Sequence, residues 1–485
     1  MRTWFERILF HTHAQPETPA IVMEDRVVTY AMLRGGIERC AHRLNSLNVD
    51  RRGPIAVIVK NPLRHLVLCY ALHRIGIPSI SLACGQSGIA SLSFPAILRD
   101  GESGALAPSW GRDIEVTDAW FAEDPDAGKE LPPGFPDSSA ICRVSLTSGA
   151  TGIPKSVQHA VAAIGRRVSE KIIGQIDSSH RGVLCLPGLS ANFGYTTSCA
   201  ALAAGRTLYF AESLAQAVRM IELFAIDFVM ASTEQLLFLT RTVRRSGANV
   251  QGLRTVWFSG SIATRLLLET AATHLCKELY CRYGATEAGL IAQASAREMI
   301  DKPGLAGLVV PDAEVAIVDA AGRRCPTGQI GVIKVRHGME PADTSDSPQA
   351  GDGWVDLGDL GWLDQDRRLY VVGRVAEGSA LTTESLRALE VEHLLQLEWD
   401  ARDVGAVFVA GAAPARGEVW VGIVNRGDGS QQKLDALLQA HGMNCAATLF
   451  DVDMIPRGPN GKVNRGQLRA MLSDLAKRSS ASTTR

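Results

Sequence analysis

The sequence predicts an α/β protein with a large N-terminal domain of parallel-rich sheets covered by helices, a β-rich subdomain, and a small α+β C-terminal domain. Three observations support this prediction. The 485 residues are too many for a single compact core. Short apolar, strand-like runs alternate with amphipathic stretches through much of the chain. From about Lys302 onward, β-rich segments with clear turn signals replace that alternation.

The alternating part includes a predicted strand, IAVIVK (55–60), and after it a predicted helix, HLVLCYALHRIG, that ends at Gly76. Further strand-like runs lead into Gly or Ser at 182–188, 227–232 and 255–260. Helical spacing occurs at 213–226 and 234–243. A strand, a small-residue turn and a helix in succession are typical of a parallel sheet, whose ligands bind beyond the carboxyl ends of the strands. The loops after these strands are therefore the expected location of the chemistry.

The segment EVAIVDAAGRRCPTGQIGVIKVRHG, with turns at AAGRR and PTGQ, predicts the β-rich subdomain. The segment WLDQDRRLYVVGR predicts a hairpin over Trp362–Arg374. A stretch short of large apolar residues follows, and then a helical pattern through Leu386, Leu389, Leu394 and Leu395. We place a domain boundary near residue 375, which gives an N-terminal domain over 1–374 and a C-terminal domain over 375–485. The latter is long enough for a small α+β domain.

Composition excludes several classes of partner. The 50 basic and 51 acidic side chains give a net charge of -1, so we expect neither nucleic acid nor an anionic membrane surface as a partner. No apolar run approaches the ~20 residues of a membrane span, and we expect no stable membrane insertion. The N-terminus is too polar for a secretory signal. Ten cysteines without a CxxC pair predict reduced, mostly buried thiols in a cytoplasmic protein.

The segment TSGATGIPKS (147–156) follows a predicted strand, AICRVSLT (140–147), and combines residue types that bind phosphate. Glycines let the backbone approach an anion closely, while hydroxyls and lysine add donors and positive charge. The residues concerned are Thr147, Ser148, Gly149, Thr151, Gly152 and Lys155. The loop is not a Walker motif, because Pro154 precedes the lysine and has no N–H. Taken alone, it fits an ordinary Ser/Gly turn with a solvated lysine at least as well.

Three more segments follow this loop in order: CRYGATEAG (281–289), VDLGDLGWLDQDRRLYVVGR (355–374) and IPRGPNGKVNR (455–465). Together the four resemble the signatures of the adenylate-forming superfamily, which contains acyl- and aryl-CoA synthetases, adenylation domains of peptide synthetases, and firefly luciferases. The resemblance spans nearly the whole chain. It implies a small, mobile C-terminal domain and an active site between the two domains. It also implies a reaction in two steps. A carboxylate attacks the α-phosphate of ATP to give an acyl-adenylate and pyrophosphate, and a nucleophile, usually a thiol, then displaces AMP.

The resemblance implies a role for each motif residue. The six loop residues named above would hold the phosphates that leave as pyrophosphate. Thr286 would contact the α-phosphate, and Glu287 would bind Mg²⁺, a hard cation suited to a carboxylate. Tyr283 and Gly284 would line the adenine and acyl pockets, beside a small-residue turn formed by Ser259, Gly260 and Ser261. Asp359 would accept the ribose hydroxyls, with Arg374 beside it. Lys462 would neutralise charge on the carboxylate and the α-phosphate.

Outside this ordered set each of these residues has a simpler interpretation. Glu287 fits a helix-start carboxylate, Asp359 a turn aspartate, and Lys462 a solvated loop lysine. The sequence also departs from the family pattern. Ala150 replaces a hydroxyl residue and Ser156 a common glycine. Ala376 stands at the usual hinge position, and Thr382 and Thr383 replace a Gly-Gly step near the expected thiol path. Thr382 and Thr383 also fit simple helix caps.

The acid is predicted from LPGLSANFGYTTS (186–198). This segment lacks the aspartate that usually pairs with an amino acid's ammonium group, which disfavours an α-amino acid. SANFGYTTS loosely resembles the corresponding segment of aryl-acid-activating members, so Asn192, Phe193 and Gly194 are the expected acyl-pocket residues. Asn192 could instead only cap or close a loop, and the small residues could equally leave room for a fatty chain. We predict an aryl or other non-amino carboxylic acid.

The leading hypothesis is an ATP- and Mg²⁺-dependent ligase that joins a small-molecule carboxylic acid to a thiol, with CoA as the expected acceptor. A second hypothesis is a stand-alone adenylating enzyme that loads the phosphopantetheine of a carrier protein, or an amine. A third is a degenerate member that binds nucleotide without turnover. Glu287, Asp359, Arg374 and Lys462 are all retained, which disfavours the third hypothesis.

Overall fold

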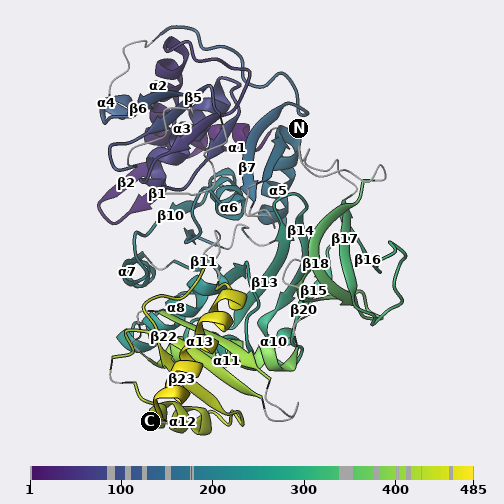
Figure 1. Ribbon diagram of the computed structural model, residues 1–485. Helices are drawn as coiled ribbons and strands as arrows, with labels where there is room; N and C mark the ends of the chain where they lie inside the picture. Colours follow the sequence, from purple (N-terminus) through teal and green to yellow (C-terminus); the bar gives the residue numbers. More distant parts are fainter. Residues whose placement is uncertain are drawn as a thin grey trace.

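A computed structural model describes most of the chain. The described residues are 3–84, 93–103, 111–122, 128–147, 155–174, 176, 180–224, 226–337, 353–375, 379–380, 382–399, 401, 403–410, 417–427, 429–457 and 463–483. Figure 1 shows the N-terminal elements (purple and blue) at one end of the molecule and the C-terminal elements (yellow) at the other.

One sheet is built from six strands in the order β6-β5-β3-β4-β7-β8. All of its pairs are parallel except β7 and β8, which form an antiparallel hairpin. The strands are β3 (Ile55–Ile58), β4 (Ser79–Ser81), β5 (Ala96–Arg99), β6 (Arg112–Glu115), β7 (Ile141–Thr147) and β8 (Lys155–Ala160). Every residue of β3 and β4 is buried, as expected of central parallel strands covered on both faces.

The largest sheet of the described region has fourteen strands and changes character along its width. Its parallel part contains β1 (Pro19–Met23), β9 (Gly182–Cys185), β10 (Thr207–Tyr209), β11 (Phe228–Ser232), β12 (Thr255–Ser259) and β13 (Glu278–Ala285), with β2 (Arg26–Thr29) antiparallel at the edge. Beyond β13 the pairs are antiparallel, through β14 (Gly289–Ser295), β15 (Leu305–Val309), β16 (Ala313–Val318), β17 (Gly331–His337), β18 (Val355–Leu363), β19 (Arg368–Arg374) and β20 (Ser379–Ala380).

Helices cover the parallel strands. They are α1 (Trp4–Ala14), α2 (Tyr30–Ser46), α3 (Pro62–Arg74), α4 (Ala119–Ala122), α5 (Val161–Gly174), α6 (Asn192–Ala203), α7 (Leu214–Phe224), α8 (Thr233–Ser246), α9 (Arg265–His274) and α10 (Ala296–Met299). Local chemistry sets their ends. At α8, the hydroxyl of Ser232 accepts from the Gln235 N–H while the Gln235 side chain accepts from the Ser232 N–H. Gly247 then ends the helix at φ +65°, in the left-handed region that favours glycine.

The C-terminal elements include a separate three-stranded sheet in the order β21-β22-β23. They are α11 (Thr383–Glu398), β21 (Asp403–Val409), β22 (Glu418–Val424), α12 (Gln431–Ala440), β23 (Ala447–Asp451) and α13 (Arg465–Thr483). Their buried apolar side chains form two clusters of their own, centred on residues such as Val391, Leu394 and Val421 in one and Val407 and Leu468 in the other. This is an α+β unit, although the boundary near residue 375 stays a prediction.

The predicted elements are largely confirmed. The strands expected at 55–60, 140–147, 182–188, 227–232 and 255–260 are β3, β7, β9, β11 and β12. The helices expected after Lys60, at 213–226 and at 234–243 are α3, α7 and α8, and the hairpin over Trp362–Arg374 falls within β18 and β19. All ten cysteines are free and six are buried, as expected of buried thiols. Within the described residues, none of the helices combines the length and apolarity needed to span a membrane.

Candidate active site

The carboxyl ends of β11, β12 and β13 meet at one edge of the large sheet, because the three strands are parallel neighbours. Ser232 and Ser259 are register partners there. The Thr233 hydroxyl, at the start of α8, donates to the Ser261 carbonyl at 2.9 Å and approaches the Ser259 carbonyl at 3.3 Å. Gly260 has φ +108° and open space where a Cβ would lie. The predicted small-residue turn is thus rigidly held, with an accessible backbone.

The motif CRYGATEAG forms the β13–β14 hairpin. Ala285 and Gly289 are register partners, so Thr286 and Glu287 lie in the turn between the strands. The interpretation of Glu287 as a helix-start carboxylate is therefore wrong. Gly284 is required by close packing, since a Cβ at this position would lie 2.2 Å from the Gly289 carbonyl oxygen. The turn presents a hydroxyl and a carboxylate, both only partly exposed, at the end of β13.

Asp359 links two motifs that are distant in sequence. The Tyr283 hydroxyl donates to Asp359 Oδ2 at 2.7 Å, and Arg374 Nε lies 3.0 Å from Asp359 Oδ1. Antiparallel pairing of β18 with β19 makes Asp359 and Arg374 register partners. Burial, and the Asp359 carboxylate next to it, raise the pKa of Tyr283 well above its ordinary value, so the phenol remains a donor. Because a carboxylate has about four acceptor positions, Asp359 can still accept from a ligand.

The ends of the predicted phosphate loop lie side by side. Thr147 ends β7, Lys155 begins β8, and the two are register partners in an antiparallel pair. Residues 148–154 of the predicted loop lie outside the described part of the chain, and with them Ser148, Gly149, Thr151 and Gly152.

The expected acyl-pocket residues begin α6. Ala191 is the N-cap residue and forms no side-chain cap, and Asn192 is the first helical residue. The Asn192 Oδ1 atom is buried with no hydrogen-bond partner among the described residues, which does not fit a capping role. Gly194 is small for a packing reason, because a Cβ there would lie 2.5 Å from the carbonyl oxygens of Pro187 and Gly188. Phe193 is partly buried against the main core.

Lys462 belongs to residues 458–462, which lie outside the described part of the chain. The two residues that flank this segment, Arg457 and Val463, form an antiparallel β-bridge. Arg457 Nη2 lies 2.6 Å from Asp403 Oδ1, and Arg457 Nη1 lies 3.8 Å from Glu234 Oε1 at the start of α8. Arg457, which precedes the segment that carries Lys462, therefore lies close to the start of α8.

The C-terminal elements pack on α8 and α9. Arg244 on α8 forms a two-pronged ion pair with Glu398 at the end of α11, with N–O distances of 2.7 and 3.0 Å. The Thr264 hydroxyl, just before α9, lies 2.9 Å from His393 Nδ1 in a buried contact. Burial lowers the pKa of His393 to about 3. Thr382, where the resemblance to thioester-forming members predicts a Gly-Gly step, is the N-cap of α11 and forms a capping box with Ser385.

Three positively charged side chains at α5 and the β13–β14 hairpin were not predicted as site residues from the sequence: Arg167 and Lys171 on α5, and Arg282 on β13. All three are buried. Arg282 directly precedes Tyr283, so its place in the motif could have drawn attention to it. On a helix as polar as α5, basic residues normally face solvent, and no sequence signal marked Arg167 or Lys171 as buried.

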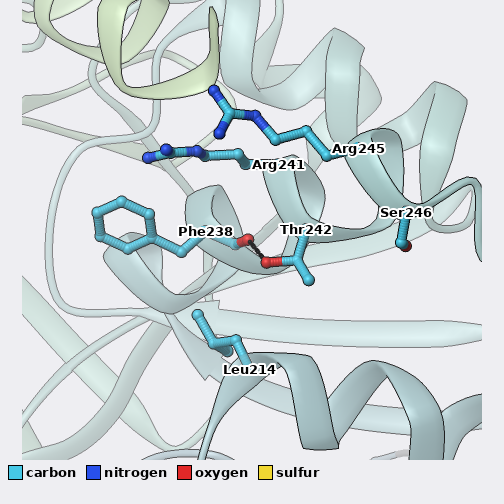
Figure 2. Close-up of a pocket in the computed structure, with 6 residues that line it drawn as sticks. All are labelled: Leu214, Phe238, Arg241, Thr242, Arg245 and Ser246. Atoms are coloured by element: carbon cyan, nitrogen blue, oxygen red, sulfur yellow. Dashed lines mark hydrogen bonds between the residues drawn. The ribbon is translucent and has the colours of Figure 1, made fainter. Parts of the chain in front are cut away.

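A groove of about 530 Å³ lies elsewhere, between α7 and α8. It is lined by Leu214, Phe238, Arg241, Thr242, Arg245 and Ser246, as Figure 2 shows. Its lining includes none of the predicted site residues. The hydrogen bond from the Thr242 hydroxyl to the Phe238 carbonyl, drawn in Figure 2, is internal to α8. The groove therefore gives no reason to move the candidate site away from the strand ends.

Comparisons with known proteins agree with this geometry. The family model described as AMP-binding enzyme matches residues 96–339. The chain is 24% identical over 523 residues to a fatty acid–[acyl-carrier-protein] ligase from Streptomyces coeruleorubidus, covering 97% of this chain and 96% of that one. It also resembles two solved structures. One is the O-succinylbenzoate coenzyme A synthetase from Bacillus subtilis in complex with ATP and magnesium ion (TM-score 0.75, 20% identity, 96% and 99% coverage). The other is an amide bond synthetase from Marinactinospora thermotolerans (TM-score 0.71, 22% identity, 97% and 99% coverage). These two likenesses confirm the predicted fold class.

Proposed function

Because this chain belongs to the AMP-binding enzyme family, of adenylate-forming ligases, we propose that it activates a carboxylic acid with ATP, releases pyrophosphate, and transfers the acyl group to a thiol. Membership of the family confirms the resemblance drawn from the four motifs. The identity of the acid and of the acceptor, and the role of each residue, belong to the proposal. So does the division into an N-terminal domain over 1–374 and a C-terminal domain over 375–485.

The observation that carries the proposal is the Tyr283–Asp359–Arg374 cluster beside the Ser259–Ser261 turn. A hydrogen bond joins Tyr283 to Asp359, which is 76 residues away in sequence. The cluster presents a carboxylate acceptor, a phenol ring and an open glycine backbone at the same sheet edge. A ribose needs paired acceptors for its hydroxyls, and an adenine needs flat, accessible surface beside it. The cluster supports binding of a nucleoside in an orientation that directs its phosphates toward the β13–β14 turn.

The chain's own residues would act mainly by positioning and by charge neutralisation, which is what phosphoryl transfer requires. Thr286 would donate its hydroxyl to the α-phosphate. Thr147 and Lys155, with the loop between them, would hold the departing pyrophosphate. Lys462 would approach from the C-terminal unit and neutralise charge on the reacting carboxylate.

Glu287 would hold Mg²⁺. Its carboxylate is partly exposed in the turn and forms no ion pair with a described residue, which fits a site for a hard cation. When bound there, the ion would neutralise charge on the phosphates.

CoA is the acceptor we expect, and two alternatives deserve direct tests. The Streptomyces relative is named for a carrier-protein acceptor, the Bacillus structure for coenzyme A, and the Marinactinospora structure for amide bonds. A carrier-protein thiol or an amine would therefore also be chemically reasonable here. Thr382 and Thr383, as the cap and first residue of α11, are bulkier than the Gly-Gly step expected on a thiol path.

The acid is proposed to be an aryl or other non-amino carboxylic acid. The Asn192 Oδ1 atom, buried without a partner at the start of α6, can accept a hydrogen bond from a substrate hydroxyl. Beside it, Phe193 offers an apolar surface.

The test is to incubate the protein with ATP, Mg²⁺ and a panel of aryl, fatty and amino acids, and to detect acyl-AMP by mass spectrometry. CoA, a carrier protein in its phosphopantetheine form, or an amine is then added, and the product is identified. We expect acyl-AMP from a non-amino acid and a thioester with CoA. Turnover of amino acids alone would overturn the assignment of the acid. Nucleotide binding without acyl-AMP from any acid would favour a degenerate member.

A further inference from the structure

The three buried cations form one group along α5 and the β13–β14 hairpin. Arg167, Lys171 and Arg282 are only 9%, 6% and 4% exposed. Arg167 and Lys171 are four residues apart and so share one face of α5. This face lies along the hairpin, because a Cβ at Gly289 would be 3.5 Å from Arg167 Nε, and a Cβ at Gly174 would be 4.0 Å from Arg282 Nη1.

The three cations differ in the hydrogen bonds and ring contacts that the protein provides for their charged groups. Arg282 donates to Gln293 Oε1 at 3.0 Å, and its guanidinium lies 3.9 Å from the ring centre of Trp257. Arg167 Nη1 is buried without a hydrogen-bond partner among the described residues. For Lys171, the described residues offer a ring contact at 6.0 Å from the centre of Phe193, and neither a hydrogen bond nor an ion pair. Arg167 and Lys171 are thus both less satisfied than Arg282.

The charge around Lys171 is unbalanced. Glu170 and Glu287 are the acids whose charge reaches this group, and in the described part of the chain no carboxylate lies within ion-pair distance of any of the three cations. Burial, with Arg282 and Arg167 adding to it, lowers the pKa of Lys171 to about 7. Burial likewise lowers the pKa of Arg167 and of Arg282 to about 10. Uncompensated buried charge is unfavourable, and ionisable groups perturbed in this way cluster at functional sites.

Lys171 lies apart from the residues that would contact the reacting carboxylate. Arg167 lies at the Gly289 end of the hairpin, next to the turn that carries Thr286 and Glu287, and its charge can serve the phosphates. Lys171 lies one helical turn further along, about 6 Å away, against Phe193. The reacting carboxylate has to be at the α-phosphate beside Thr286. Because Phe193 is an expected acyl-pocket residue, an anion at Lys171 would be a second group on the same acid.

We propose that the acid activated by this protein is a dicarboxylic acid, and that Lys171 binds its second carboxylate, with Arg282 behind it adding positive charge. This inference rests on the proposed function, since it names the substrate class of that same site. Lys171 then determines which acids are accepted. It would hold the far end of the acid and leave the first carboxylate free to react.

The experiment compares matched acids that differ by one carboxylate: hexanoate with adipate, octanoate with suberate, and cinnamate with 4-carboxycinnamate. Pyrophosphate release is measured as kcat/KM for the wild type and for Lys171→Met, which removes the charge and keeps the length of the side chain. Lys277→Met, at an exposed lysine, is the matched control. We expect the wild type and the control to prefer the diacid at least tenfold in one or more pairs, and Lys171→Met to narrow that ratio to below twofold.

The possible results are distinct. A wild type that prefers the monoacid in every pair, or a ratio that Lys171→Met leaves unchanged, would overturn the dicarboxylate assignment and leave the proposed function standing. No pyrophosphate release with any acid would overturn the proposed function itself. Turnover of a monoacid by Lys171→Met shows that the variant is folded. A role of Lys171 in packing alone would change the melting temperature of the variant without changing the ratio between paired acids.

Discussion

Asp359 is the single residue on which the nucleotide assignment depends most. Its two oxygens are already oriented by Tyr283 and Arg374, so its geometry exists before any ligand binds. A preorganised acceptor of this kind binds more tightly than one that must be ordered by its ligand.

Replacing Asp359 with Asn should raise the KM for ATP about 10- to 100-fold, because hydrogen bonds to charged groups contribute roughly 1.5–3 kcal/mol. The measurement is acid-dependent pyrophosphate release at varied ATP concentration. Tyr283→Phe, which removes one donor but keeps the carboxylate, should have the smaller effect. An unchanged KM in Asp359→Asn would refute the ribose role.

The helix α11 connects the expected thiol path with the packing of the C-terminal unit on the rest of the protein. Its N-cap, Thr382, stands at the expected thiol path, and its buried face carries His393 against Thr264. The same helix therefore bears on thiol transfer at one end and on attachment of the C-terminal unit along its length.

The double substitution Thr382→Gly with Thr383→Gly should speed transfer of a preformed acyl-adenylate to CoA, because it opens the path where two β-branched residues now stand. Adenylation should be unaffected. The loss of stability should be about 1 kcal/mol, since glycine at an N-cap costs only a few tenths and glycine within a helix up to about 1 kcal/mol. Single-turnover kinetics with purified acyl-adenylate measure the step. A rate that stays the same or falls would show that these threonines do not obstruct it.

Because His393 is buried, we expect the free energy of unfolding to depend on pH. Its folded-state pKa is about 3 and its ordinary value is 6.5, so below pH 6.5 the unfolded chain binds a proton that the folded chain does not. Stability is thus lost as the pH falls. Between pH 7.5 and 5.5, wild type should lose about 1.4 kcal/mol more of its free energy of unfolding than His393→Gln. Urea denaturation of both proteins at the two pH values tests this, and equal losses would contradict it.

Features that depend on a local sequence pattern could be predicted, whereas features that depend on contacts between distant segments could not. Hydrophobic periodicity is local, so β3, β11, β12, α7 and α8 were all found from the sequence alone. The hairpin of β18 and β19 was found from its turn residues. The burial of Lys171 could not be predicted from the sequence, because it arises when α5 packs along the β13–β14 hairpin, which is a contact between distant segments. The helix-start interpretation of Glu287 was wrong for a related reason: YGATE continues a strand into a turn set by pairing with β14.

For the molecule as a whole, the proposed reaction requires the C-terminal unit to bring Lys462 to the strand ends of the large sheet. Arg457 contacts both Asp403 in that unit and Glu234 on α8, and the segment with Lys462 follows directly. Figure 1 shows these C-terminal elements against α8. The packing combines polar contacts such as the Arg244–Glu398 pair with apolar ones, among them Leu397 on α11 and Leu266 on α9.

The most direct test of the central claim is carboxylate-dependent exchange of labelled pyrophosphate into ATP, measured for the wild type, Lys462→Ala and Lys477→Ala. Lys477 is a largely exposed lysine of the same unit, so its variant controls for the loss of a surface charge. We predict exchange by the wild type and by Lys477→Ala, and a loss of at least 100-fold in Lys462→Ala with the fold intact by circular dichroism, since electrostatic stabilisation of this kind contributes about 10²–10³ in rate. Wild-type exchange rates in Lys462→Ala, or no exchange by the wild type with any acid, would contradict the account.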